Sequence, residues 1–192
     1  MPRMDSTINM ILCTGNPNHN TVASAVARQF PQAQFASRAT GYDLRFWDSG
    51  SEDYFREQIA KFDIFINSSF ICGGGQSALL ETTFEVWSKN LIQGHIINIG
   101  SSAEFLGTND PQVSDGVYGK YSIQKRALRD RSLQLNNQNH IKTTHIIAGG
   151  LNDGKPGHES WLNLDTLAET IAWVLKNPAD IPLLYIQGCA KG

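Results

Sequence analysis

Cysteine is scarce in this chain. The 192 residues include three cysteines, Cys13, Cys72 and Cys189, which lie far apart and form no Cys-x-x-Cys pair. An odd number of separated cysteines argues against a disulfide framework or a zinc site. The five histidines also lack the spacing of metal ligands. We therefore expect no metal, and a reducing cytoplasm as the natural setting.

Long hydrophobic runs and an excess of one charge are also absent. Hydrophobic residues make up 41% of the chain, but their longest runs reach only the length of a strand. The first five residues do not begin a signal-peptide core. The net charge of -2 gives no electrostatic reason to expect nucleic acid or an anionic membrane as a partner. The composition indicates a soluble globular protein that acts on neither.

Strand and helix signals alternate along the chain. Nearly continuous apolar or β-branched runs predict strands at 8–14, 34–37, 63–67, 95–99, 143–148 and 183–187. Helical periodicity lies between them, at 21–30, 51–62, 79–90, 118–135 and 164–176. This alternation is typical of an α/β protein with a doubly wound, Rossmann-like parallel sheet. We expect about six strands in one domain, residues 1–192.

Small or polar residues follow each predicted inner strand. These pairs are Thr14-Gly15, Ser37-Arg38, Asn67-Ser68, Ser101-Ser102 and Gly149-Gly150. In open parallel sheets, ligands bind outside the carboxyl ends of the strands. The pattern therefore predicts that one edge of the sheet binds a nucleotide and a substrate.

Tyr121 and Lys125 are the most informative pair of residues. Residues four apart lie on one helix face, so both side chains can reach the same pocket. An ammonium near a phenol favours the phenolate and lowers the phenol pKa from about 10. With the hydroxyl of Ser101, the pair can transfer a proton. A solvated surface pair is the competing interpretation, so the motif needs its context.

That context resembles the short-chain dehydrogenase/reductase family along nearly the whole chain. Thr14-Gly15 is similar to the start of its glycine-rich cofactor turn, and Tyr121 and Lys125 match its catalytic pair. The segment 97–101 resembles its serine strand. The resemblance implies cofactor contacts from Thr14, Gly15, Asn16, Asn20, Thr21, Arg38, Asp43, Leu44, Asn67, Ser68, Ser69, Lys125, Gly149 and Gly150.

The resemblance implies an oxidoreductase that moves a hydride between a nicotinamide cofactor and a small carbonyl or alcohol substrate. Tyr121 would be the general acid or base, Ser101 would bind the substrate oxygen, with Ser102 as the alternative, and Lys125 would bind the nicotinamide ribose. Arg38 at the end of the second strand favours NADP(H), with NAD(H) possible. The family also implies a homodimer or homotetramer.

Several features depart from the family pattern. The cofactor turn from Gly15 to Ala23 has only one glycine, although Asn16 and Asn20 tolerate unusual backbone angles. Between Arg38 and Asp43 there is no room for a crossover helix, so the third strand of the family is reduced or missing. Trp87 stands about where a catalytic Asn is usual. The chain resembles the reduced, phage-type members, and a non-catalytic dinucleotide-binding sensor or scaffold is the alternative.

A P-loop is a second alternative, because Gly149–Lys155 satisfies Gly-x₄-Gly-Lys after a strand. Pro156 follows where a Ser or Thr should hold Mg²⁺, so we interpret this segment as a loop on the substrate side. We expect Trp47, Trp161 and Trp173 to pack in the core or cover a loop, with Trp173 on the apolar face of the last helix.

Overall fold

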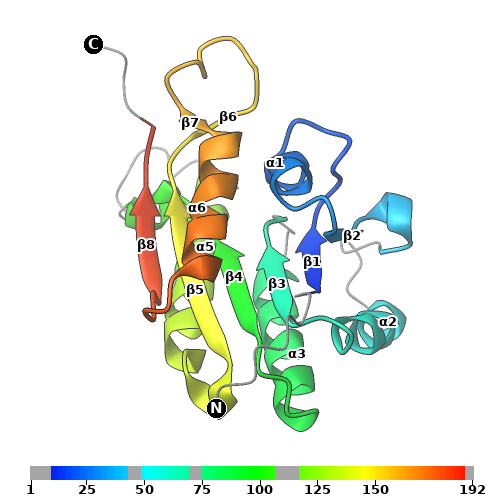
Figure 1. Cartoon of the computed structure of the whole chain (residues 1–192). Coiled ribbons are helices and arrows are strands. Elements are labelled where there is room, and N and C mark those ends of the chain that lie inside the picture. Colours follow the sequence, from blue (N-terminus) through cyan, green and yellow to red (C-terminus); the bar gives the residue numbers. More distant parts are fainter. Residues whose placement is uncertain (1–9, 43–48, 70–74, 107–116, 189–192) are drawn as a thin grey trace.

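A computed structural model of the chain describes residues 10–42, 49–69, 75–106 and 117–188 (Figure 1). The predicted adenine contacts Asp43 and Leu44 lie outside the described residues, as do Cys72, Cys189 and Trp47. No helix in the described ranges is long and apolar enough to cross a membrane.

A six-stranded parallel sheet forms the centre of the molecule. Its strands are β1 (Ile11–Thr14), β2 (Gln34–Ala36), β3 (Ile64–Asn67), β4 (His95–Ile99), β5 (Lys142–Ala148) and β8 (Leu183–Ile186). Their order is β2-β1-β3-β4-β5-β8. β2 is added on one side of β1, whereas β3, β4, β5 and β8 are added one after another on the other side. The direction in which strands are added therefore reverses between β1 and β3. The doubly wound fold predicted from the sequence is confirmed, and this reversal is where such sheets bind ligands.

β2 is the outermost described strand on its side of the sheet. The chain leaves it through a short 3-10 helix, Arg38–Thr40, which ends at Gly41 with φ of 90°. The stretch from Arg38 to Gly41 leaves no room for a third strand and its crossover helix, as predicted. Within the described residues, no further strand pairs with β2 at this edge.

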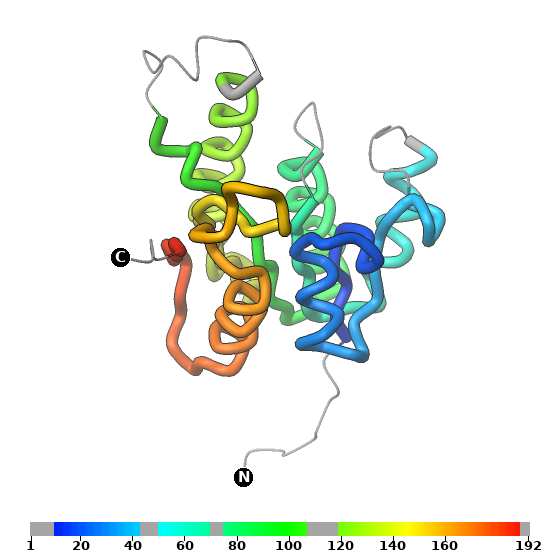
Figure 2. The backbone as a smooth tube through the Cα atoms, turned by 90° about the horizontal axis from the view of Figure 1, so that it is seen from above, coloured from blue at the N-terminus to red at the C-terminus, as the bar shows by residue number. Residues whose placement is uncertain are grey.

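Two layers of helices cover the sheet. They are α1 (Val22–Gln29), α2 (Ser49–Ile59), α3 (Gly75–Lys89), α5 (Val117–Leu135) and α6 (Leu164–Lys176). α1 and α6 lie on one face and α2, α3 and α5 on the other (Figures 1 and 2).

Alternate residues of each strand supply the two cores. Ile64 and Ile66 face α1 and α6, whereas Phe65 between them packs with Phe55 and Trp87 on the opposite face. Side chains alternate across a sheet, so a strand covered on both faces is mostly apolar, and its buried polar side chains must be hydrogen-bonded. Each fully buried large apolar side chain contributes roughly 1.5–3 kcal/mol by leaving water. This burial holds the carboxyl ends of the strands in a fixed register.

A second, very small parallel sheet follows β5. It pairs β6 (Leu151–Asn152) with β7 (Leu162–Asn163), which leads directly into α6. Strands of two residues have no readable periodicity, so the sequence did not predict them. After β6 the chain turns through Gly154, with φ of 84°, and no helix begins until Leu164. A P-loop would enter a helix at once, and the segment Gly149–Lys155 is therefore not one.

The described tryptophans differ in their surroundings. Trp87 is fully buried, and Trp161 covers Gly150 and stacks on His158 with 3.5 Å between ring centroids. Trp173 is 52% exposed, so its predicted place on the apolar face of α6 is wrong. That face is formed by Leu167 and Ile171, and Trp173 lies on the opposite side of the helix.

Candidate active site

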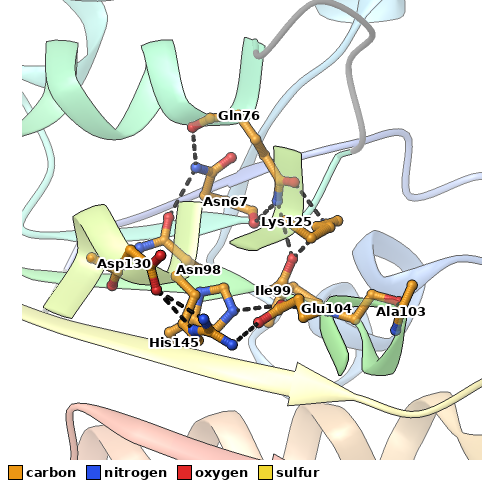
Figure 3. Close-up of polar contacts among 12 residues, drawn as sticks. Asn67, Gln76, Asn98, Ile99, Ala103, Glu104, Lys125, Asp130 and His145 are labelled. Carbon is orange, nitrogen blue, oxygen red and sulfur yellow. Dashed lines mark hydrogen bonds and ion pairs between the residues drawn. The ribbon is translucent and has the colours of Figure 1, made fainter. Parts of the chain in front are cut away.

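Lys125 is buried at the carboxyl end of β4. Its residue exposure is 4%, and its ammonium donates hydrogen bonds to the Gln76 Oε1 atom (2.7 Å) and the Ile99 carbonyl oxygen (2.8 Å). Figure 3 shows this arrangement. A lysine ammonium has three donors, so these bonds fix the side chain and leave one donor for a further partner.

The environment of Lys125 changes its acidity. Burial lowers the pKa of its ammonium to about 8, and the nearby negative charge of Glu104 partly opposes that shift. The Lys125 Nζ atom lies 5.6 Å from the centre of the Tyr121 ring, and Tyr121 is half-buried. The structure therefore brings Tyr121 and Lys125 to one face of α5, as their spacing predicts.

Gln76 is a partner that the sequence did not indicate. Its Nε2 atom donates to the carbonyl oxygens of Asn67 (2.7 Å) and Ile99 (3.2 Å), while its Oε1 accepts from Lys125. The helical periodicity in the sequence begins only at residue 79, but α3 begins at Gly75 and includes Gln76 in its first turn. Trp87, which stands about where the family has an Asn, instead packs in the core and donates to the Ile59 carbonyl.

Asn67 belongs to the framework behind Lys125. Its side chain donates to the Gln76 carbonyl (2.8 Å) and to Asn98 Oδ1 (3.0 Å), and Asn98 in turn donates to Ser132 Oγ (3.1 Å). Asn67, Asn98 and Ser132 are all fully buried. Buried amides are stable only when paired, so this chain of bonds fixes β3, β4 and α5 relative to one another.

Ser101 lies just after β4, at the start of the 3-10 helix η2 (Ser102–Phe105). Its Oγ atom accepts a hydrogen bond from the Ala103 N–H (3.2 Å), and its own N–H donates to Glu104 Oε1 (2.9 Å). The hydroxyl proton of Ser101 has no acceptor among the described residues. Lys125 binds Ile99, two residues earlier, so Ser101 and the Tyr121–Lys125 pair occupy the same corner of the sheet edge.

A buried acid and a buried histidine support that corner. Glu104 Oε1 also lies 2.8 Å from His145 Nε2, and both side chains are fully shielded from water. Arg129 Nη1 lies 3.7 Å from Glu104 Oε2. The sequence did not indicate this pair, because its members are 41 positions apart and meet only when β5 lies beside β4.

A second corner forms where β1 and β3 end. Thr14 Oγ1 accepts from the N–H groups of Ser68 (2.8 Å) and Ser69 (3.0 Å), and Ser68 Oγ donates to the Thr14 carbonyl. Gly15 follows with φ of 124°, and a Cβ there would lie 2.9 Å from Ala23 Cβ and 3.3 Å from Ser69 Oγ. Glycine is therefore required, and four predicted cofactor residues meet at the switch point.

The loop from Gly15 to α1 is held by its own backbone. Asn16 Oδ1 accepts from the Asn18 N–H (3.0 Å), and Thr21 Oγ1 donates to the Asn16 carbonyl (3.3 Å). Thr21 caps α1 through its bonds with Ser24. The free N–H groups at the start of a helix suit a diphosphate, so this loop fits the cofactor that the resemblance implies.

The remaining predicted contacts surround these corners. Arg38 is exposed after β2, and its side chain forms no hydrogen bond with the described residues, so its guanidinium can reach a phosphate. Asn20 is exposed next to Gly154, whose Cβ would lie 3.2 Å from its Nδ2, and the β6–β7 loop lies beside α1 (Figure 2). Gly149 is buried beside Gln187, and Gly150 is exposed but lies next to the Trp161 ring. The described residues contain no group of three potential metal ligands.

Known structures have the same fold. A 4-hydroxyisoleucine dehydrogenase complexed with NADH is 16% identical, with 94% of this chain and 98% of that chain covered and a TM-score of 0.69. An alcohol dehydrogenase from the archaeon Thermococcus sibiricus, complexed with 5-hydroxy-NADP, is 14% identical over 93% and 96% of the two chains, with a TM-score of 0.68.

A 3-alpha-hydroxysteroid dehydrogenase from Pseudomonas sp. B-0831, complexed with NADH, is 15% identical over 93% and 95% of the two chains, with a TM-score of 0.67. No protein-family model and no curated protein sequence matches this chain. The chain has the short-chain dehydrogenase/reductase fold, as its sequence predicts.

Proposed function

We propose that this protein is an oxidoreductase of the short-chain dehydrogenase/reductase type. It transfers a hydride between a nicotinamide cofactor, with NADP(H) favoured, and a small carbonyl or alcohol substrate. The observation that supports this most is the buried Lys125 ammonium, held by Gln76 and Ile99 beside Tyr121. A solvated surface pair would not be held in this way.

The residues of the first corner, which are Ser101, Tyr121 and Lys125, have separate roles. When bound, the nicotinamide supplies the hydride for carbonyl reduction. Tyr121 donates its phenolic proton to the substrate oxygen, and Ser101 donates a hydrogen bond to the same oxygen. The positive charge of Lys125 stabilises the phenolate that remains, and its third N–H binds the nicotinamide ribose. The phenolate then recovers a proton from water.

The second corner binds the rest of the cofactor. Gly15 and the N-terminus of α1 hold the diphosphate, with Thr14, Asn16, Asn20 and Thr21 shaping the turn around it. Arg38 pairs with the 2′-phosphate, because a guanidinium forms two parallel bonds to a phosphate.

The remaining cofactor contacts come from several loops. Asp43 and Leu44 contact the adenine in this proposal, although both lie outside the described residues. Ser68 and Ser69 border the nucleotide, with Asn67 behind them. Gly149 and Gly150 border the nicotinamide below Trp161.

A matched pair of tyrosine substitutions tests the proposal. NADPH and NADH are titrated into the wild type, and cofactor oxidation is followed with a panel of small aldehydes and ketones. Tyr121→Phe should lower turnover by about 10²- to 10⁴-fold without weakening cofactor binding. Tyr185→Phe is the control, because Tyr185 is exposed on β8, its hydroxyl bonds only Gln187 in the described part of the chain, and the substitution keeps its ring contact with Phe105. Equal turnover in the two variants would refute the role of Tyr121.

A non-catalytic dinucleotide-binding sensor or scaffold is the second candidate. The single glycine of the cofactor turn favours it, since the family pattern has two more and Gly15 already lies against Ala23. Tight cofactor binding without turnover across the whole carbonyl panel would support this candidate over the enzyme.

The proposed assembly is a homodimer or homotetramer paired through α3 and α5. Ile123 and Leu133 of α5 are 60% and 38% exposed, which supplies apolar surface for such a contact. Sedimentation should give a mass of two or four chains for the wild type and of one chain for Ile123→Glu. A monomeric wild type would exclude this assembly.

A further inference from the structure

The Glu104 carboxylate is buried directly behind Ser101. Its side chain has no exposure to water, and an isolated carboxylate in such a place is costly unless it is paired. Three groups compensate it: the Ser101 N–H at 2.9 Å, His145 Nε2 at 2.8 Å and, more distantly, Arg129 Nη1 at 3.7 Å. Two of these come from other elements, β5 and α5, so Glu104 ties the Ser101 turn to the rest of the core.

Gly100 permits this arrangement. A Cβ at this position would overlap both His145 Nε2 and Glu104 Oε1. The carboxylate and the imidazole therefore pack against the backbone that leads from β4 into Ser101.

The geometry also determines how the Ser101 hydroxyl can bond. Ser101 Oγ accepts a hydrogen bond from the Ala103 N–H. The proton of the same hydroxyl is still available, so Ser101 can donate a hydrogen bond to a substrate oxygen. The acceptor bond exists only while the turn Ser101–Glu104 is closed. That closure is a capping box, in which the carboxylate of Glu104 accepts from the Ser101 N–H.

We propose that Glu104, backed by His145, is a positioning residue: it holds Ser101 as a hydrogen-bond donor and places a buried negative charge near Lys125. The catalytic meaning of this role rests on the proposed function. The charged and titratable groups around the carboxylate are Arg129 of α5, His145 of β5 and Lys125 of α5. Both hydrogen bonds that the Lys125 ammonium donates to described residues go to neutral oxygens, so Glu104 is the acid whose charge favours the ammonium.

Two substitutions separate the geometry from the charge. Glu104→Gln keeps an oxygen for the Ser101 N–H but removes the charge, and Glu104→Ala removes both. Glu81→Gln is the control, because Glu81 pairs with Arg131 on the exposed side of α3. All are studied without cofactor, by amide hydrogen exchange of Ser101 and Ala103 and by NMR titration of the Lys125 side chain.

In Glu104→Gln, the Lys125 titration should move to lower pH by about half a unit or more, with the Ser101 amide still protected. In Glu104→Ala, exchange of the Ser101 and Ala103 amides should accelerate about tenfold or more. The control should change neither. The proposal is overturned if the exchange rates of the Ser101 and Ala103 amides are unchanged in a folded Glu104→Ala variant. It is also overturned if the Lys125 side chain titrates at the same pH in Glu104→Gln as in the wild type.

Turnover provides the link to catalysis. Glu104→Gln should lower kcat about tenfold or more and leave the KM for the cofactor unchanged, since the second corner is intact. If the wild type binds no dinucleotide, the proposed function fails, whereas the cofactor-free exchange and titration still decide the structural role of Glu104. If Glu104→Ala does not fold, Gly100→Ala displaces the pair without altering either member, and should expose the same two amides.

Discussion

The two corners of the sheet edge are built differently. Around Lys125, the polar groups are buried and bonded to one another across β3, β4, α3 and α5. Around Gly15, the loop toward α1 is exposed, and its side chains bond mainly to their own backbone. The first corner is therefore held by the core, and the second by a local turn. Changes at the first should alter proton transfer, together with the ribose contact of Lys125, whereas changes at the second should alter cofactor affinity alone.

Among the substitutions that test the first corner at Lys125 and Gln76, Lys125→Met should have the largest effect on turnover. Turnover should fall about 100-fold or more, because the charge that stabilises the Tyr121 phenolate is lost. Cofactor oxidation at saturating substrate measures this effect. A variant that keeps turnover within a few-fold of the wild type would remove Lys125 from the mechanism.

The same substitution should change how stability depends on pH. The unfolded chain holds the Lys125 proton up to the ordinary lysine pKa of 10.5, whereas the folded protein releases it at about 8. Between these values the unfolded state binds more protons, so the wild type gains stability as pH rises, by up to roughly 1.4 kcal/mol per pH unit from this group. Urea unfolding from pH 7 to 10.5 should show this gain relative to Lys125→Met. Parallel stability curves would contradict the buried, charged lysine.

Gly15→Ala should affect the second corner alone. The added Cβ meets Ala23 at a φ of 124°, and such strain costs about 1–3 kcal/mol. The Kd for NADPH should rise about tenfold, while kcat at saturation stays near the wild-type value. Gly157→Ala is a matched control, since its φ is 88° but no atom lies within 4 Å of the added Cβ. If both variants bind equally, the close approach at Gly15 has no part in binding.

Gln76 allows a finer test of the first corner. Gln76→Glu places a carboxylate against the Lys125 ammonium and should raise its pKa above about 8, whereas Gln76→Leu removes an acceptor and should lower it. The pH dependence of kcat should shift in the same two directions. Identical profiles would show that Gln76 does not influence the group that titrates.

Arg38→Ala should have the most selective effect, on one of the two cofactors only. Because Arg38 is expected to bind only the 2′-phosphate, the substitution should weaken NADPH binding about tenfold and leave NADH binding unchanged. Arg28→Ala is the control, since Arg28 pairs with Asp165 on the exposed side of α1. Equal losses for both cofactors would move Arg38 out of the 2′-phosphate site.

The sequence predicted the parts of this molecule that depend on local pattern. The inner strands could be found because they are covered on both faces and consist mostly of apolar or β-branched residues. Tyr121 and Lys125 could be placed together because helical spacing alone brings them to one face. The position of Ser101 followed from its place at the end of β4.

The features that the sequence did not predict depend on contacts between distant segments. Gln76 follows three glycines, so the predicted helix began only at residue 79 and left Gln76 out. Glu104 and His145 meet only through the pairing of β4 with β5. Trp173 was placed in the core because α6 is apolar on more than one side, and only packing decides which side is buried.

Deuterium transfer tests the central claim most directly. NADPH carrying deuterium at the nicotinamide C4 is incubated with the wild type and with Tyr121→Phe, and the alcohol formed from a reduced carbonyl is examined by mass spectrometry. The wild type should place the deuterium on the carbinol carbon, and Tyr121→Phe should transfer almost none while binding NADPH equally well. Equal transfer by both proteins, or none by a wild type saturated with NADPH, would contradict a proton-transfer site at Tyr121 and Lys125.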